Sequence, residues 1–309
     1  MSQTGAIGDK LFRTILFAAA SSILLIVVAM LYMMVQNALP TIQRFGLNFL
    51  TGSAWKPAQE EFGALPFIYG TVVSSLVAVV LSVPLSLGIA IFLVEQAPKR
   101  IARPIAFLVE LLAAIPSVVY GLWGIFVLAP FIRDYLGVFL QNYLGWLAFF
   151  QGRLTGIGML TGGIILALMI TPIITAVVRD VLEAVPVTQR EAALALGATK
   201  WETTSIVLGN AASGIAGAVV LGLGRAIGET MAVTMVIGNS PQISASLFEP
   251  ANTIASLLAA NFAEATDKIY LSALIEIGLV LFLVTFVVNA LAKLLIMSVA
   301  GGTNSAKHV

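Results

Sequence analysis

The sequence predicts an all-α polytopic membrane protein, built as a bundle of six transmembrane helices. Of its 309 residues, 59% are hydrophobic and 10% are charged, and the mean hydropathy of +1.02 lies far above that of soluble domains. Six apolar stretches are long enough to cross a hydrocarbon core, which takes roughly 20 residues. They cover approximately residues 15–39, 67–94, 105–131, 157–178, 214–237 and 269–297.

The first stretch follows Lys10 and Arg13, as the apolar part of a secretory signal would. It is longer than such a segment, and no clear small-residue cleavage site comes after it, so we expect a retained anchor. Residues 40–66 then combine prolines with Trp55 and the acidic pair Glu60 and Glu61, a composition typical of an external loop.

Proline interrupts the second, third and fourth stretches. Pro84, Pro116, Pro130 and Pro172 each remove a backbone hydrogen bond that lipid cannot replace, so we expect kinks that face neighbouring helices or a cavity. Residues 132–156 are aromatic but interrupted by polar residues, which favours an interfacial helix over a seventh crossing. That helix would belong to an aromatic belt or, on a less favoured interpretation, form a platform for an external partner.

Pairs of glycines mark the fourth and fifth stretches. Gly158 and Gly162 are four residues apart in one, and Gly224 and Gly228 in the other. This spacing lets helix backbones approach closely, so we expect both helices to lie centrally in the bundle.

The basic residues predict the orientation. With the N-terminus in the cytoplasm, the inner segments carry ten Lys and Arg residues, Lys307 among them, and the outer segments carry five. Both termini, and the loop between the fourth and fifth stretches, are therefore predicted to be cytoplasmic.

Composition and motifs exclude several functions. A net charge of +1 offers no field that would attract nucleic acid. The chain has no cysteine and a single histidine, His308, which excludes disulfides and soft-metal sites. The sequence lacks the glycine-rich phosphate-binding motif of ATPases, so we expect no ATPase site and no cofactor on this chain.

The cytoplasmic loop contains a predicted short helix. Thr188 and Glu191 have the spacing of a capping box with Thr188 as N-cap, and Gly197 fits the left-handed position after the helix. A second short amphipathic helix is predicted from Trp201 to Leu208. Either the loop is read by a cytosolic partner, or Glu191 only caps the helix and Trp201 only lies at the membrane surface.

Charged residues within the fifth stretch form the second candidate site. Arg225 and Glu229 are four residues apart on one helix face, and charges inside a membrane normally face the bundle interior. Arg225 would offer its guanidinium to an oxyanion in transit while Glu229 weakens the site enough for release; the alternative is a structural ion pair. Glu110 and Glu276 are expected to serve polar packing or cavity lining, although either could pair with Arg225 or relay protons.

The loop resembles the EAA loop of ABC importer permeases, the short helices that dock on the cytosolic ATPase. The likeness rests on Glu191, Ala192 and Ala193, followed by Gly197 and Ala198. After nine further residues the family pattern continues with Ile-x-Leu-Pro, where this chain has Val207-Leu208-Gly209-Asn210. The resemblance implies that these residues, with Trp201, couple the membrane helices to ATP hydrolysis.

Three further segments are similar to phosphate-specific ABC permeases of the PstC-like type. They are residues 65–71, 115–124 and 222–233. The resemblance implies a type I ABC importer permease fold with both termini cytoplasmic and a substrate path lined by Arg225, Glu229 and Thr230. It divides the chain into an N-terminal part over residues 1–66, a permease core over 67–297 with the coupling loop at about 186–210, and a tail over 298–309.

The same resemblance implies a complex in the bacterial cytoplasmic membrane that imports inorganic phosphate. Its other members would be a second, PstA-like permease subunit, two cytosolic PstB-like ATPase subunits that bind ATP and Mg²⁺, and an extracytoplasmic PstS-like phosphate-binding protein. The alternatives are a permease for sulfate or molybdate, a proton-coupled secondary carrier, and a membrane scaffold whose loop recruits a cytosolic enzyme.

Overall fold

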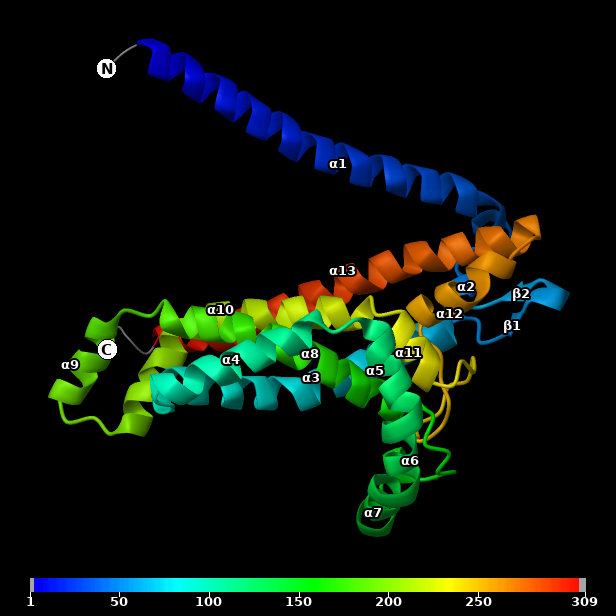
Figure 1. Cartoon of the computed structure of the whole chain (residues 1–309). Helices are drawn as coiled ribbons and strands as arrows, with labels where there is room; N and C mark the ends of the chain where they lie inside the picture. The colour runs from blue at the N-terminus through cyan, green and yellow to red at the C-terminus, as the bar shows by residue number, and fades with distance from the viewer. Residues whose placement is uncertain (1–2, 306–309) are drawn as a thin grey trace.

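The computed structural model describes the backbone of residues 3–305 and the side-chain surroundings of residues 8–294 (Figure 1). The regular secondary structure of the described part is helical apart from a two-stranded antiparallel hairpin, β1 and β2, and one isolated bridge between Gly238 and Ala251. The elements that matter below are α1 (Gln3–Phe45), α2 (Asn48–Thr51), β1 (Trp55–Lys56), β2 (Glu61–Phe62), α3 (Leu65–Ile91), the π-helical turn η2 (Phe92–Gln96), α4 (Lys99–Ala114), α5 (Ser117–Trp123), α6 (Ala129–Phe131), α7 (Gly137–Leu144), α8 (Met159–Glu183), α9 (Val187–Ala195), α10 (Lys200–Ile227), α11 (Met231–Val236), α12 (Ile254–Asn261) and α13 (Lys268–Ser305).

Within residues 8–294, six helical segments are long and apolar enough to span a membrane, which confirms the predicted fold class. The first, second, fourth and sixth predicted stretches fall in α1, α3, α8 and α13. The fifth is divided between α10 and the short α11. α13 continues to Ser305, past residue 297 where the permease core was predicted to end. Lys307 and His308 lie outside the described residues.

The predicted third stretch, residues 105–131, is wrong as a single helix. The chain is extended at Ile115 and Pro116, so α4 ends at Ala114 and a new helical segment runs from Ser117 to Leu144. α4 packs along α8, whereas α5, α6 and α7 turn away from that direction (Figure 1). The predicted interfacial helix in 132–156 is therefore the end of this segment rather than a separate element.

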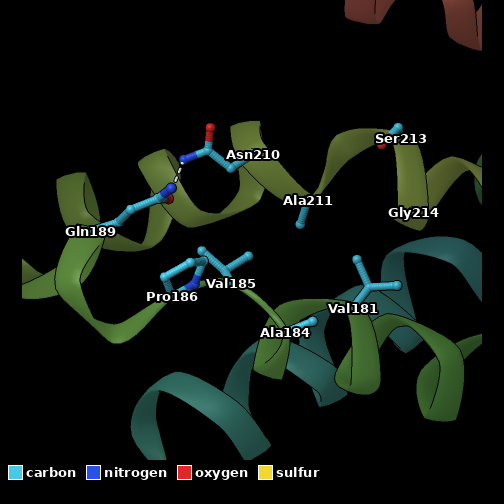
Figure 2. A pocket seen from close by; sticks show the side chains of 9 residues that line it. All are labelled: Val181, Ala184, Val185, Pro186, Gln189, Asn210, Ala211, Ser213 and Gly214. Atoms are coloured by element: carbon cyan, nitrogen blue, oxygen red, sulfur yellow. Dashed lines mark hydrogen bonds between the residues drawn. The ribbon is translucent and has the colours of Figure 1, made fainter. Parts of the chain in front are cut away.

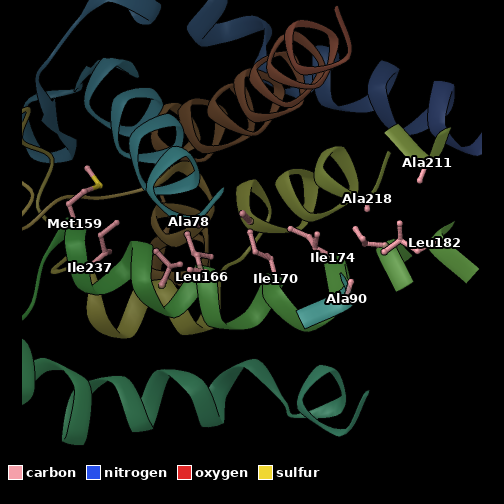
Figure 3. Packing of buried hydrophobic residues seen from close by; sticks show 14 of the residues in the cluster. Ala78, Ala90, Met159, Leu166, Ile170, Ile174, Leu182, Ala211, Ala218 and Ile237 are labelled. Carbon is pink, nitrogen blue, oxygen red and sulfur yellow. The ribbon is translucent and has the colours of Figure 1, made fainter. Parts of the chain in front are cut away.

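The main core lies where α3, α8 and α10 pack together (Figure 3). α8 is its centre, with Ile170 and Ile174 fully buried. Close approach depends on glycines next to the predicted ones: a Cβ on Gly163 would lie 2.5 Å from Val77 of α3, and one on Gly222 would lie 2.6 Å from Ile174. Gly162, Gly224 and Gly228 have ordinary space around them, so these three predicted positions are wrong, whereas a Cβ on Gly158 would lie 2.5 Å from Phe248 O. The central place of both helices is confirmed.

A second core lies at the opposite end of the bundle from α9 (Figure 1). There the β1–β2 hairpin sets Trp55 and Phe62 against Tyr270 of α13, with ring centroids 6.4 and 5.8 Å apart. The adjoining end of α1 is joined to α13 by a hydrogen bond of 3.0 Å between the hydroxyls of Thr41 and Ser272. The rest of α1 leaves the bundle with most of its side chains exposed.

Candidate functional site

The predicted loop helix exists as α9, but it begins differently from the prediction. Its N-cap is Pro186, no side chain caps it, and Thr188 lies inside the helix. The predicted capping box between Thr188 and Glu191 is therefore wrong. Glu191 is exposed, and its carboxylate makes no hydrogen bond or ion pair within the described residues.

The end of α9 confirms the prediction for Gly197. Its φ is +84°, its N–H donates to Leu194 O at 3.0 Å, and the N–H of Ala198 donates to Ala193 O at 3.1 Å. These are the two bonds of a Schellman motif, which needs a residue in the left-handed region at the glycine position. The chain reverses sharply there and enters α10.

The loop presents an exposed surface. Ala192 is exposed, Leu196 is 90% exposed and Trp201 is 69% exposed, whereas Ala193 is buried against the rest of the protein. Apolar side chains held outward on a rigid turn suit a protein partner. This surface offers apolar contact area.

The second predicted loop helix, Trp201 to Leu208, is wrong as a separate element because it is the first part of α10. Thr199 caps α10: its hydroxyl accepts from the N–H of Glu202, and its own N–H donates to the Glu202 carboxylate at 2.7 Å. This is a capping box with the spacing predicted for Thr188 and Glu191. α10 then runs without interruption to Ile227.

Asn210, where the chain departs from the EAA pattern, joins α10 to α9. Its Nδ2 donates to Gln189 Oε1 at 2.7 Å (Figure 2). Below this bond lies a pocket of about 440 Å³ between the end of α8, α9 and α10, floored by Val181 and Val185. The departure thus supplies a link between the two helices of the loop.

The second candidate site lies where α10 ends. Gly228 to Thr230 interrupt the helix, and α11 begins at Met231. Glu229 is buried, its side chain 4% exposed, and its Oε1 accepts the N–H of Ala232 at 3.3 Å, where a carboxylate favours the start of a helix. Arg225 Nη2 lies 3.6 Å from Glu229 Oε2, and the Arg225 side chain is 54% exposed.

The ion pair between Arg225 and Glu229 is therefore present, and it is asymmetric. The carboxylate is fixed inside the protein, while the guanidinium makes no other ion pair within residues 8–294 and its side chain is half-exposed. Thr230 is half-buried in the break beside them. The arrangement can hold an anion on the exposed side of Arg225.

The two other membrane acids do not join this pair. Glu110 of α4 forms an ion pair with Arg179 of α8, Oε1 to Nη1 at 2.9 Å, which supports the polar-packing interpretation. Glu276 of α13 is buried, and its Oε2 has no hydrogen-bond partner among the described residues.

The sequence reasoning missed a buried ion pair beside the loop. Arg190 of α9 meets Glu95 of η2, Nη2 to Oε1 at 2.8 Å, with the two side chains 17% and 10% exposed. Glu95 stands just beyond an apolar stretch and Arg190 stands within the loop helix, two places where single charges look solvated.

The chain matches the family described as binding-protein-dependent transport system inner membrane component over residues 82–300. It is similar to PstC proteins, each named phosphate transport system permease protein. It is 45% identical to that of Xylella fastidiosa over 94% of this chain and 90% of the relative, and 43% identical to that of Mesorhizobium japonicum over 97% and 93%. The PstC protein of Haemophilus influenzae is 45% identical, with 93% of each chain covered.

Among solved structures, an inward-facing MetNI methionine ABC transporter has a similar fold. The TM-score is 0.53 at 16% identity, covering 78% of this chain and 98% of that one. This likeness confirms the predicted ABC importer permease fold. The matched family model and the relatives together show that this chain, a multi-pass membrane protein, belongs to the family of binding-protein-dependent transport system inner membrane components.

Proposed function

We propose that the chain is the permease subunit of an ATP-driven importer that moves inorganic phosphate across the bacterial cytoplasmic membrane. The observation that carries the proposal is the similarity to phosphate permeases over nearly the full chain, at 45% identity. The exposed guanidinium of Arg225 supports it, because its planar donors suit a phosphate oxyanion.

In this proposal the surface around α9 docks on a cytosolic ATPase. Glu191, Ala192, Leu196 and Trp201 are exposed on a loop whose turn is fixed by Gly197. Two ATPase subunits bind ATP and Mg²⁺ and move the loop. A second permease subunit completes the pathway, and a phosphate-binding protein delivers substrate at the opposite end of the bundle. The end that carries α9 faces the cytoplasm, and both chain termini lie on that side.

Arg225, Glu229 and Thr230 line the substrate path. Arg225 donates to the phosphate oxygens. Glu229 stays buried and holds Arg225 from behind, which limits how tightly the anion binds. Thr230 lies in the non-helical break, where its carbonyl accepts the N–H of Thr234 at 3.0 Å and its hydroxyl is the group offered to phosphate.

Reconstitution into proteoliposomes tests the proposal. We expect phosphate uptake that needs hydrolysable ATP, the ATPase and the phosphate-binding protein. Uptake driven by a pH gradient alone would contradict it in favour of a secondary carrier, and preferential uptake of sulfate or molybdate would contradict the substrate. A complete assembly without any uptake would point to a scaffold.

A further inference from the structure

The side chain of Arg190 lies where three elements meet. Its Nε and Nη2 donate to Glu95 Oε1 of η2 at 3.1 and 2.8 Å. Its Nη1 donates to Val185 O at 2.7 Å, and its Nη2 also donates to Leu182 O at 2.9 Å. The guanidinium of α9 is thus bonded to η2, which follows α3, and to the end of α8.

Each partner has a physical reason to be there. Leu182 and Val185 expose carbonyls at the C-terminal end of α8, where a helix leaves acceptors unsatisfied and favours a positive charge. Glu95 lies in a π-helical turn, a distortion that re-aims side chains and is common at functional sites. The three elements converge on one planar group with donors in fixed directions.

The pair is buried, so it is not a solvated surface bridge. Its side chains are 17% and 10% exposed, against 20% and 54% for the neighbouring pair of Arg179 and Glu110. Removing one partner of a buried ion pair leaves a charge without compensation, so such a contact resists separation. Capping of α8 alone would need only the two carbonyls; the carboxylate of Glu95 adds the connection to α3.

We infer that Arg190 and Glu95 are positioning residues that make the docking helix α9 move as one body with α8 and α3. The inference rests on the proposed function, because it describes how movement of an ATPase reaches the membrane helices. Neither residue touches substrate or nucleotide. Without the pair, α9 follows the ATPase while α3 and α8 lag, and less phosphate is moved for each ATP hydrolysed.

The first test measures phosphate moved per ATP hydrolysed in the reconstituted complex. We expect this ratio to fall about fivefold or more in Glu95→Gln and Arg190→Gln, the size of a typical coupling between sites. Glu110→Gln is the matched control, since it breaks another ion pair of α8 at the same end without contact to α9, and its ratio should stay unchanged. We call the bonded pair of Arg190 and Glu95 the clamp. An unchanged ratio in both Glu95→Gln and Arg190→Gln, or an equal loss in Glu110→Gln, would overturn the inference.

A second test can refute the inference in a chain that keeps both Arg190 and Glu95, so its refuting result does not depend on how well the glutamine variants assemble. The chain lacks cysteine, so Gln96→Cys and Thr188→Cys place spin labels on exposed sites of η2 and α9 without other changes. In the full complex we expect one narrow distance that is the same without nucleotide and with ATP bound, and a broadened one when Arg190→Gln is added. A distance that changes between nucleotide states in the otherwise unaltered chain refutes the clamp.

The two proposals fail in different ways. If the unaltered complex moves no phosphate, the proposed function fails, and the distance measurement still decides whether α9 and η2 move together. If phosphate moves and the labelled distance changes with nucleotide, the proposed function stands and the clamp fails.

Discussion

Replacing Glu229 by glutamine separates its electrostatic role from its structural one. The amide oxygen still accepts the N–H of Ala232, which Glu229 Oε1 now accepts at 3.3 Å, so the start of α11 is kept. What is lost is the charge that lies 3.6 Å from Arg225 Nη2. Because Arg225 is half-exposed, screening limits that attraction to about 1 kcal/mol, or roughly fivefold in an equilibrium constant.

An unopposed Arg225 should hold phosphate about fivefold more tightly, from that loss of about 1 kcal/mol, and release it correspondingly more slowly. We expect the maximal rate of ATP-driven phosphate uptake to fall by a similar factor in Glu229→Gln, with the complex assembled as before. Initial rates in proteoliposomes at saturating phosphate-loaded binding protein measure this, and co-purification of the ATPase measures assembly. An unchanged maximal rate would refute the reasoning, as would loss of assembly, which would make the pair purely structural.

Substitutions at Arg225, Asn210 and Gly222 test other contacts, with Gly217→Ala as a control. Arg225→Gln should abolish phosphate uptake while the complex stays assembled. Arg225→Lys should keep little of the uptake, because an ammonium group lacks the planar pair of donors of a guanidinium. Full uptake by the lysine variant would contradict this. Asn210→Ala should cost about 1 kcal/mol through its lost bond to Gln189, seen as a lower melting temperature of the purified complex, and an unchanged temperature would contradict it. Gly222→Val should cost at least about 1–3 kcal/mol by overpacking, seen in the same measurement, whereas Gly217→Ala, with open space around it, should not destabilise; equal losses would contradict this.

Hydropathy was sufficient to predict where most of the helices lie, because the cost of unpaired backbone in lipid leaves few alternatives. It could not predict how the third stretch divides. Pro116 was read as a kink, but the residue before a proline is disfavoured in helix, and the chain at Ile115 became fully extended. Conversely, the second loop helix was predicted to end at Leu208, yet α10 continues because its side chains are packed against α8 and α9.

The loop shows which local signals can be trusted. Gly197 was predictable because a left-handed turn excludes most other residues. Thr188 and Thr199 each have a glutamate three residues later, and only the second forms a capping box. Their local patterns are alike, so the difference comes from where Pro186 starts the helix. The contact between Glu95 and Arg190 joins positions far apart in the chain, which no local pattern reveals.

The unbroken length of α10 has one more consequence. Its 28 residues, about 42 Å at 1.5 Å per residue, form a stiff rod between the loop at Lys200 and the break after Ile227. A helix of this kind does not change its length when it moves, so a displacement of Lys200 along the helix axis would also displace the turn that ends at Ile227. Arg225 stands on the last turn of that rod, where any stroke of the loop would present its guanidinium at a new depth in the membrane.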